Sequence, residues 1–241
     1  DLVGGNTKYT AGAMRFAYNS SQELLPLLSK PDDPRILRTN FGSYTQDEFK
    51  KDLLSFNDGE PITPEQQILV SNSYDTMIWL AQHGVTYEPV WARQSFEKNG
   101  KIVFWGGLTL AAENEGVGLF EMAAAAFKRL GGKMQLNSEF KSLLIKNGTI
   151  KGIKLTSGLE IKSRSVVLAC GGFESSESMR EEFLGRVWRQ AKVRGTPYNT
   201  GAGLRAAWNA GAQRYGRFDR CHATPMDYYM KNYGNLNIAH G

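Results

Sequence analysis

Apolar residues recur at helical spacing in three parts of the chain. The periodicity predicts packing helices over residues 45–56, 63–84 and 117–130. The first two helices begin with capping boxes, in which the hydroxyls of Thr45 and Thr63 and the side chains of Glu48 and Gln66 satisfy amides of the first turn. His83 falls at the end of the second helix, where we expect it to have a structural role.

A second pattern, with alternating apolar and polar residues, fills the middle of the chain and predicts strands over residues 133–137, 139–146, 149–156 and 159–162. Asn147-Gly148 is a strong hairpin signal between two of these strands, so a β-meander is expected here. The continuous apolar run Val166–Leu168 then opens into Gly171 and Gly172. That run predicts a strand that is buried on both faces and ends in a tight turn.

The remaining stretches carry weaker patterns. Residues 14–28 are predicted to be partly helical, with Pro26 as an interruption, and short helices are predicted over 176–184 and 204–210. Residues 91–110 are predicted to be irregular. Helices, a meander, a buried strand, a glycine turn and further helices in this order indicate an α/β fold.

The chain has 241 residues, enough for one large domain or one domain with part of another, and 26 of them are glycine. Glycines gather at 4–12 and 201–203 as well as in the 171–172 turn. A bare backbone admits a ligand closely, and the amides at a helix start bind anions. Three such loops favour a nucleotide-type cofactor; the alternative is a core strand with ordinary tight turns.

The net charge is +5, from 29 basic and 24 acidic residues that are spread along the chain. This balance indicates either a solvated basic surface or a field that attracts anions. No aromatic-and-basic cluster favours nucleic acid as a partner. Cys170 and Cys221 are expected to be free thiols in a reducing compartment, with the cytoplasm as the default location. The histidines are too scattered for a metal cluster, and no apolar run approaches the ~20 residues that cross a bilayer.

Three motifs occur in order: Gly-Gly-Asn-Thr-Lys-Tyr-Thr-Ala-Gly at 4–12, Val-Val-Leu-Ala-Cys-Gly-Gly-Phe at 166–173 and Asn-Thr-Gly-Ala-Gly-Leu at 199–204. Together with Gly211-Ala212 and His222, they resemble the flavoprotein subunit of the fumarate reductase/succinate dehydrogenase family. The resemblance covers essentially the whole chain. The segments at 194–200 and 221–225 are most similar to the tricarballylate dehydrogenase branch of that family.

The resemblance implies a Rossmann-like FAD-binding domain over 1–220, with a helical insertion over about 20–110, and the beginning of a capping or substrate domain over 221–241. The implied activity is FAD-dependent dehydrogenation of a di- or tricarboxylate to an alkene, or reduction of a fumarate-like alkene. The implied partners are a polycarboxylate substrate and a redox protein that reoxidises the flavin.

The resemblance also implies site residues. His222 would hydrogen-bond a substrate carboxylate and Gly12 would lie near the substrate, with Arg15 and Arg194 as further candidate cations. The residues expected to contact FAD are Gly5, Asn6, Thr7, Ala11, Gly12, Phe140, Ala169, Cys170, Gly171, Gly172 and Ala202.

Two departures from the family pattern matter. The family's Gly-Asp-Gly is Gly201-Ala202-Gly203 here, and losing one charge-assisted hydrogen bond costs about 1.5–3 kcal/mol. The family's first glycine motif would lie before residue 1, and its acid/base arginine after residue 241. We therefore expect an incomplete domain, an internal fragment that carries no catalytic residue of its own.

Two other classes of function stay open at this point. Ala202 favours a non-catalytic flavoprotein-fold module that docks a subunit or redox partner. The basic balance leaves a nucleic-acid binder as a third hypothesis, which would require steeply salt-dependent binding.

Overall fold

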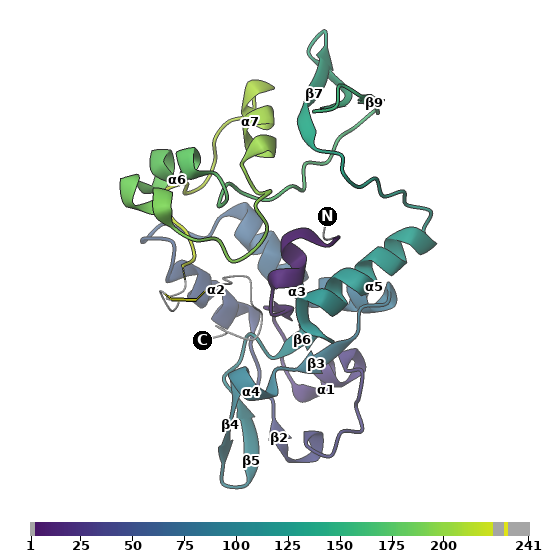
Figure 1. The fold of residues 1–241 in the computed structure, drawn as a ribbon. Helices are drawn as coiled ribbons and strands as arrows, with labels where there is room; N and C mark the ends of the chain where they lie inside the picture. Colours follow the sequence, from purple (N-terminus) through teal and green to yellow (C-terminus); the bar gives the residue numbers. More distant parts are fainter. Residues whose placement is uncertain (1–2, 224–228, 231–241) are drawn as a thin grey trace. The chain divides into compact units, whose positions relative to one another are not determined.

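The structure is a computed structural model that describes residues 3–223 and 229–230, and it divides into two compact units (Figure 1). The helical unit is Thr7–Lys133. The meander unit contains the residues up to Asn6 and those from Met134 onward. The predicted domain boundary at residue 220 stays a prediction, because most of 221–241 lies outside the described residues.

The helical unit contains two small sheets. β6 (Leu110–Ala112) lies between β1 (Ala13–Met14) and β3 (Tyr87–Pro89), antiparallel to both. In the second sheet, β5 (Lys101–Phe104) pairs with β4 (Ser95–Lys98) as an antiparallel hairpin and with β2 (Thr39–Asn40) in parallel.

The helices of this unit agree well with the periodicity. α2 (Gln46–Leu54) and α3 (Pro64–Gln82) carry both predicted capping boxes, and α5 (Glu115–Arg129) confirms the third helix. Residues 14–28 are only partly helical, as predicted, with α1 (Ser21–Leu24) followed by the 3-10 turn η2 (Leu25–Leu27). The first 133 residues also contain the 3-10 helices η1 (Gly5–Tyr9) and η3 (Ile36–Arg38) and the short helix α4 (Trp91–Gln94).

The prediction that residues 91–110 are irregular is wrong. This stretch forms α4, β4 and β5, and the turn of the hairpin is Asn99-Gly100, with φ of 52° and 73°. Two successive positive φ values are what a type I′ hairpin turn requires, and Asn-Gly adopts them readily. The signal is the same as the one at Asn147-Gly148.

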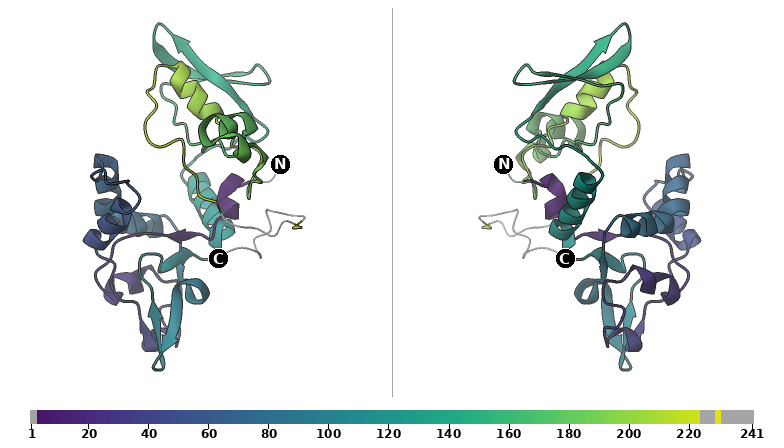
Figure 2. Two further views of the ribbon diagram at one scale, coloured as in Figure 1. Left: turned by 90° about the vertical axis from the view of Figure 1, so that its left-hand side faces the viewer. Right: turned by 90° about the vertical axis from the view of Figure 1, so that its right-hand side faces the viewer.

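The meander unit contains one antiparallel sheet, β7 (Phe140–Lys146), β8 (Thr149–Leu155) and β9 (Glu160–Lys162). Asn147-Gly148 makes the β7–β8 turn, as predicted, but residues 133–137 form no strand. α7 (Ala202–Asn209) packs against β7, and α6 (Glu177–Leu184) is followed by the 3-10 helix η4 (Arg186–Gln190) (Figure 2).

The buried strand predicted at Val166–Leu168 is wrong. The segment is extended but belongs to no sheet of the described residues, and Val167 and Leu168 are 89% and 38% exposed. An apolar strand is buried on both faces only where strands flank it and helices cover it. The mixed helix and sheet architecture is confirmed, and the Rossmann-like parallel sheet stays a prediction.

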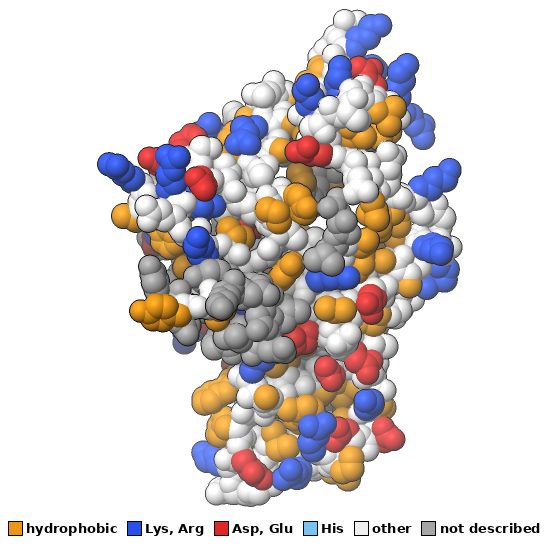
Figure 3. All heavy atoms as spheres, in the orientation of Figure 1, with side chains coloured by type: hydrophobic (Ala, Val, Ile, Leu, Met, Phe, Trp, Pro, Cys, Tyr) orange, Lys and Arg blue, Asp and Glu red, His pale blue; other side chains and the backbone are white. Residues whose placement is uncertain are grey.

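The net charge is less evenly spread than the sequence analysis suggested. Between Lys133 and Arg164 the only acidic residues are Glu139 and Glu160, so the net charge of this segment equals the +5 of the whole chain. Figure 3 shows the Lys and Arg side chains over the β7–β9 sheet. The basic residues are Lys133, Lys141, Lys146, Lys151, Lys154, Lys162 and Arg164.

No helix among the described residues has the length and apolar character that a membrane span requires.

A buried polar pair lies in the core of the helical unit. The Tyr18 hydroxyl donates to the Phe41 carbonyl oxygen at 2.8 Å and bonds the Thr109 hydroxyl at 2.7 Å. Burial raises the pKa of the Tyr18 phenol. Removing the Tyr18 hydroxyl leaves the buried Phe41 carbonyl and the buried Thr109 hydroxyl without this hydrogen-bond partner. Leaving a buried polar group unsatisfied costs its full desolvation free energy.

We predict that Tyr18→Phe lowers the free energy of unfolding by about 1–3 kcal/mol, measured by urea denaturation. Tyr215→Phe is the matched control, because Tyr215 is 73% exposed, and it should change stability by less than about 0.5 kcal/mol. Equal stability of the two variants would contradict the prediction.

Candidate functional site

Three loops of the meander unit meet at one carboxylate. The side-chain amides of Asn6 and Asn199 both donate to Glu174 Oε1, at 2.8 and 2.6 Å. Asn6 Oδ1 accepts the backbone amide of Thr196 at 2.7 Å. The opening glycine loop, the turn after Gly171-Gly172 and the 194–201 loop are therefore bound to one another through side chains.

Backbone and hydroxyl contacts complete this junction. The Ser175 amide donates to the Asn199 carbonyl at 2.9 Å, and the Ser175 hydroxyl donates to the Thr196 carbonyl at 2.7 Å. The Gly201 amide donates to the Gly172 carbonyl at 3.0 Å, immediately before α7 begins. The glycine turn and the start of α7, two of the predicted cofactor loops, thus lie side by side.

Two glycines leave the space that the asparagine side chains occupy. Gly171 has φ +74°, and a Cβ there would lie well inside van der Waals contact of Asn199 Nδ2. Gly195 has φ +159°, and a Cβ there would lie 2.7 Å from Asn6 Oδ1. A side chain at either position would displace the amide from its place at Glu174.

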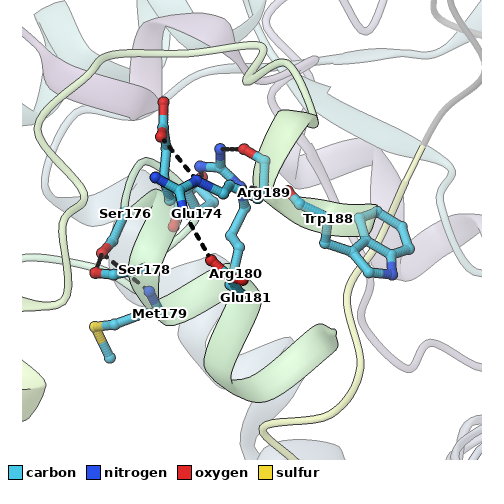
Figure 4. Close-up of polar contacts among 9 residues, drawn as sticks. Glu174, Ser176, Ser178, Met179, Arg180, Glu181, Trp188 and Arg189 are labelled. Carbon is cyan, nitrogen blue, oxygen red and sulfur yellow. Dashed lines mark hydrogen bonds and ion pairs between the residues drawn. The ribbon is translucent and has the colours of Figure 1, made fainter. Parts of the chain in front are cut away.

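Arg180 is buried beneath this turn and ties α6 to η4. Its guanidinium donates to the carbonyl oxygen of Glu174 and to those of Trp188 and Arg189, at 2.8 and 2.7 Å (Figure 4). None of the described carboxylates forms an ion pair with it. Carbonyl dipoles solvate a buried cation without cancelling its charge, so positive potential remains here.

Aromatic rings support the other side of the turn. Phe173 packs on Phe183 with ring centroids 5.3 Å apart, and Trp208 of α7 meets Phe218 at 5.6 Å. Arg214 lies over the Trp208 ring at 4.2 Å, a cation–π contact. This cluster fixes Phe173 and, with it, the residues on either side.

A cavity of about 700 Å³ opens beside the turn, wholly within the meander unit. Its wall combines aromatic and aliphatic side chains with several cations. The lining residues are Gly172, Phe173, Glu174, Arg180, Leu184, Trp188, Ala191, Lys192, Val193, Arg194, Arg220, Cys221, His222 and Ala223.

The cavity lining is strongly cationic. Arg180, Lys192, Arg194 and Arg220 line it, and among the described residues of the wall Glu174 is the one acid. The acid next to Arg220 in sequence is Asp219, which accepts two hydrogen bonds from Arg217, at 2.8 and 2.7 Å. These hydrogen bonds lower the pKa of the Asp219 carboxyl to about 2. Such a wall favours an anionic ligand with an apolar part.

The structure brings several predicted site residues together in the meander unit. His222, Gly172 and Arg194 line one cavity. Cys170 lies beside α7, since a Cβ on Gly203 would overlap its sulfur, and Ala202 is the first residue of that helix. Both cysteines are free and exposed, as predicted.

Other predicted site residues are not among those that line this cavity. Phe140 begins β7, where it pairs with Leu155, and it does not line the cavity. Gly5 and Ala169 do not line the cavity either, and their contacts with FAD stay predictions. Thr7, Ala11 and Gly12 belong to the helical unit, where a Cβ on Gly12 would lie 2.7 Å from the Glu115 carbonyl carbon.

Arg15 also lies in the helical unit, where Tyr44 and Asp52 bind it. Its guanidinium donates to the Tyr44 hydroxyl at 2.9 Å and forms an ion pair with Asp52 at 3.3 Å. Burial, followed by the hydrogen bond to Asp52, raises the pKa of Tyr44 to about 12.

Sequence analysis missed Glu174, Arg180, Trp188, Lys192 and Arg220. One signal was available for Glu174, because a charged residue directly after Gly-Gly-Phe cannot continue the apolar strand and needs polar partners. Arg180 had no such signal, since a basic residue inside a short helix most often points to solvent.

A family profile described as "FAD binding domain" matches residues 40–229. The chain belongs to this family of FAD-binding oxidoreductases. FAD is the cofactor that the membership indicates, in agreement with the prediction. The match includes the glycine turn, the start of α7 and every lining residue of the cavity.

Two named proteins are among the relatives of this chain in sequence. The chain is 32% identical over 123 residues to the 3-oxosteroid 1-dehydrogenase of Mycobacterium tuberculosis, covering 44% of this chain and 22% of the relative. It is 28% identical over 153 residues to the vinyl phenol reductase of Lactiplantibacillus plantarum, covering 61% and 29%. The chain therefore spans less than a third of the length of either protein.

Two solved structures share the fold. One is the 3-ketosteroid delta1-dehydrogenase of Sterolibacterium denitrificans in complex with 1,4-androstadiene-3,17-dione, with a TM-score of 0.66 at 17% identity, covering 87% of this chain and 49% of that one. The other is Mycobacterium smegmatis Sdh1 in complex with UQ1, with a TM-score of 0.53 at 14% identity, covering 87% and 33%.

The meander unit fits parts of a dinucleotide. Gly171 and Gly172 expose bare backbone beside the start of α7, whose first amides have no partner within the helix and attract a phosphate. The cavity next to them offers aromatic surface and positive charge. Gly171, Gly172 and Ala202 would hold the cofactor here through backbone atoms.

We predict that Arg180→Met lowers the free energy of unfolding by about 3 kcal/mol or more, since hydrogen bonds to charged groups contribute about 1.5–3 kcal/mol each. Chemical denaturation measures the effect. Arg189→Met is the matched control, because the Arg189 side chain pairs with Glu177 and Glu181 in solvent. The control should lose less than about 1 kcal/mol. Equal losses in the two variants would contradict the buried role of Arg180.

Proposed function

We propose that the full-length protein carrying this chain is an FAD-dependent oxidoreductase that acts on a carbon–carbon bond of a di- or tricarboxylate. One observation supports the substrate class above all: four cations and His222 line one cavity beside the glycine turn, and Glu174 is the single acid among the described residues of its wall. A substrate with two or three carboxylates needs several cationic partners, and this wall offers them. The similarity of 194–200 and 221–225 to tricarballylate dehydrogenases favours tricarballylate.

The roles proposed for this chain are binding and orientation. FAD, when bound, supplies the redox chemistry. Arg194, Arg220 and His222 bind substrate carboxylates, and Trp188 and Phe173 exclude water from one side of the cavity. The reaction is the oxidation of a C–C single bond to an alkene, or the reverse.

The named relatives support a second candidate function. Two of them are, by name, a 3-oxosteroid dehydrogenase and a vinyl phenol reductase, whose named substrates are not polycarboxylates. The apolar part of the cavity wall, with Phe173, Leu184, Trp188 and Val193, suits a steroid or phenolic ring as well. A third candidate, the non-catalytic docking module, would bind FAD and turn over none of these substrates.

A substrate panel separates the three candidates. The FAD-loaded full-length protein is assayed with a dye acceptor on tricarballylate, succinate and a 3-ketosteroid, and with reduced dye donor on fumarate and 4-vinylphenol. We expect turnover of a polycarboxylate and none of the steroid or the phenol. Turnover of the steroid or the phenol alone would overturn the substrate class. No turnover of any substrate by FAD-loaded protein would favour the docking module.

We predict that Arg194→Gln raises the KM for the carboxylate substrate by roughly tenfold or more with a smaller change in kcat, since a charge-assisted hydrogen bond contributes about 1.5–3 kcal/mol. Steady-state kinetics measures both constants. Arg186→Gln is the matched control, an exposed arginine of η4 that does not line the cavity. An unchanged KM in Arg194→Gln would remove Arg194 from the substrate site.

A further inference from the structure

We infer that Glu174 is the positioning residue that holds the three cofactor loops of the meander unit in place for FAD. The inference rests on the hydrogen bonds that converge on its carboxylate and on the glycines that make room for them. It concerns FAD binding, so it does not depend on which substrate the protein uses.

The carboxylate suits this junction because it only accepts hydrogen bonds. Asn6 Nδ2 and Asn199 Nδ2 both donate to Oε1, so one oxygen joins two loops. The backbone carbonyl of the same residue accepts from Arg180. Glu174 is thus fixed from below by a buried cation while its carboxylate binds the loops above it.

The orientation of the Asn6 amide follows from its surroundings. Its Oδ1 accepts the Thr196 amide, so its nitrogen must face Glu174 and donate. A carboxylate satisfies that nitrogen without ambiguity, whereas a second amide could face it with either end. The network therefore specifies one arrangement of the loops.

The second oxygen of the carboxylate lies over the cofactor turn. A Cβ on Gly172 would be 3.0 Å from Glu174 Oε2. The carboxylate thus packs against the bare backbone that is predicted to contact FAD. Any shift of Glu174 moves that backbone as well, and this is how a residue can set cofactor affinity without contacting the cofactor.

Gly171 and Gly195 belong to the same hydrogen-bond network. Each leaves the volume that one of the two asparagine side chains fills, on the side facing the carboxylate. Either glycine could have been explained by turn geometry alone. Each glycine lies beside one of the two asparagines that donate to Glu174 Oε1. The two glycines therefore also make room for this hydrogen-bonded junction.

Cofactor titration of the full-length apoprotein, followed by flavin fluorescence, tests the inference. Glu174→Ala should raise the Kd for FAD by roughly ten- to a hundredfold, the equivalent of about 1.5–3 kcal/mol. Glu174→Gln keeps an oxygen that accepts and should stay within about fivefold of wild type. Glu181→Ala, an acid of α6 that pairs with Arg189 in solvent, is the matched control and should leave Kd unchanged.

A donor–acceptor swap separates positioning from a general loss of structure. Asn199→Asp places a second carboxylate against Glu174 and should raise Kd by at least roughly tenfold through like-charge repulsion. Adding Glu174→Gln to that variant removes the like-charge repulsion, although one atom in the place of Oε1 cannot donate to the new aspartate and also accept from Asn6 Nδ2. The double variant should therefore recover in part: it should bind FAD more tightly than Asn199→Asp and more weakly than wild type.

Two results would overturn the inference. One is a wild-type Kd in Glu174→Ala. The other is that the double variant Asn199→Asp with Glu174→Gln binds FAD no better than Asn199→Asp alone. This second result tests the inference even if Glu174→Ala does not fold. The titration contains no substrate, so a failure of the carboxylate proposal in the substrate panel leaves this result intact.

Discussion

The architecture of the meander unit depends on a single oxygen. Oε1 of Glu174 accepts amide hydrogens from Asn6 and Asn199, which lie 168 and 25 residues away in the sequence. The loops that carry these residues have no shared sheet or helix to align them. A charge-assisted hydrogen bond is about twice as strong as a neutral one, which makes a carboxylate an effective anchor for such loops. The position of the glycine turn follows from this junction.

Charge connects the junction to the cavity beside it. Arg180 is buried and bonded to three carbonyl oxygens, so its position is fixed while its charge is only solvated by dipoles. Lys192, Arg194 and Arg220 add to that potential along the wall. The carboxylate of Glu174 faces two amide donors and partly offsets it. The cavity is therefore a place where an anion would be stabilised next to an apolar surface.

Local sequence signals account for most of the secondary structure. The capping boxes at Thr45 and Thr63, the α5 periodicity and the Asn147-Gly148 turn all depend on residues within a few positions of one another. The hairpin at Asn99-Gly100 could have been predicted from the same turn chemistry, although the sequence analysis predicted an irregular stretch there. Of the residues that the sequence analysis named as site candidates, Gly172, Arg194 and His222 line one cavity, and their roles there stay predictions.

The chain by itself thus determined its helix starts, its hairpin turns and the glycine positions of its candidate site. Tertiary structure decided the rest, since burial and long-range bonding depend on partners that no local pattern names. Val166–Leu168 has the composition of a core strand, yet no described strand flanks it and it is exposed. Glu174 and Arg180 look like ordinary charged residues in the sequence. Only folding brings Asn6 and Asn199 to Glu174, because these residues lie 168 and 25 positions away from it in the sequence. The carbonyls that bind Arg180 are close in sequence, but the packing of η4 against α6 decides that its side chain turns inward to meet them.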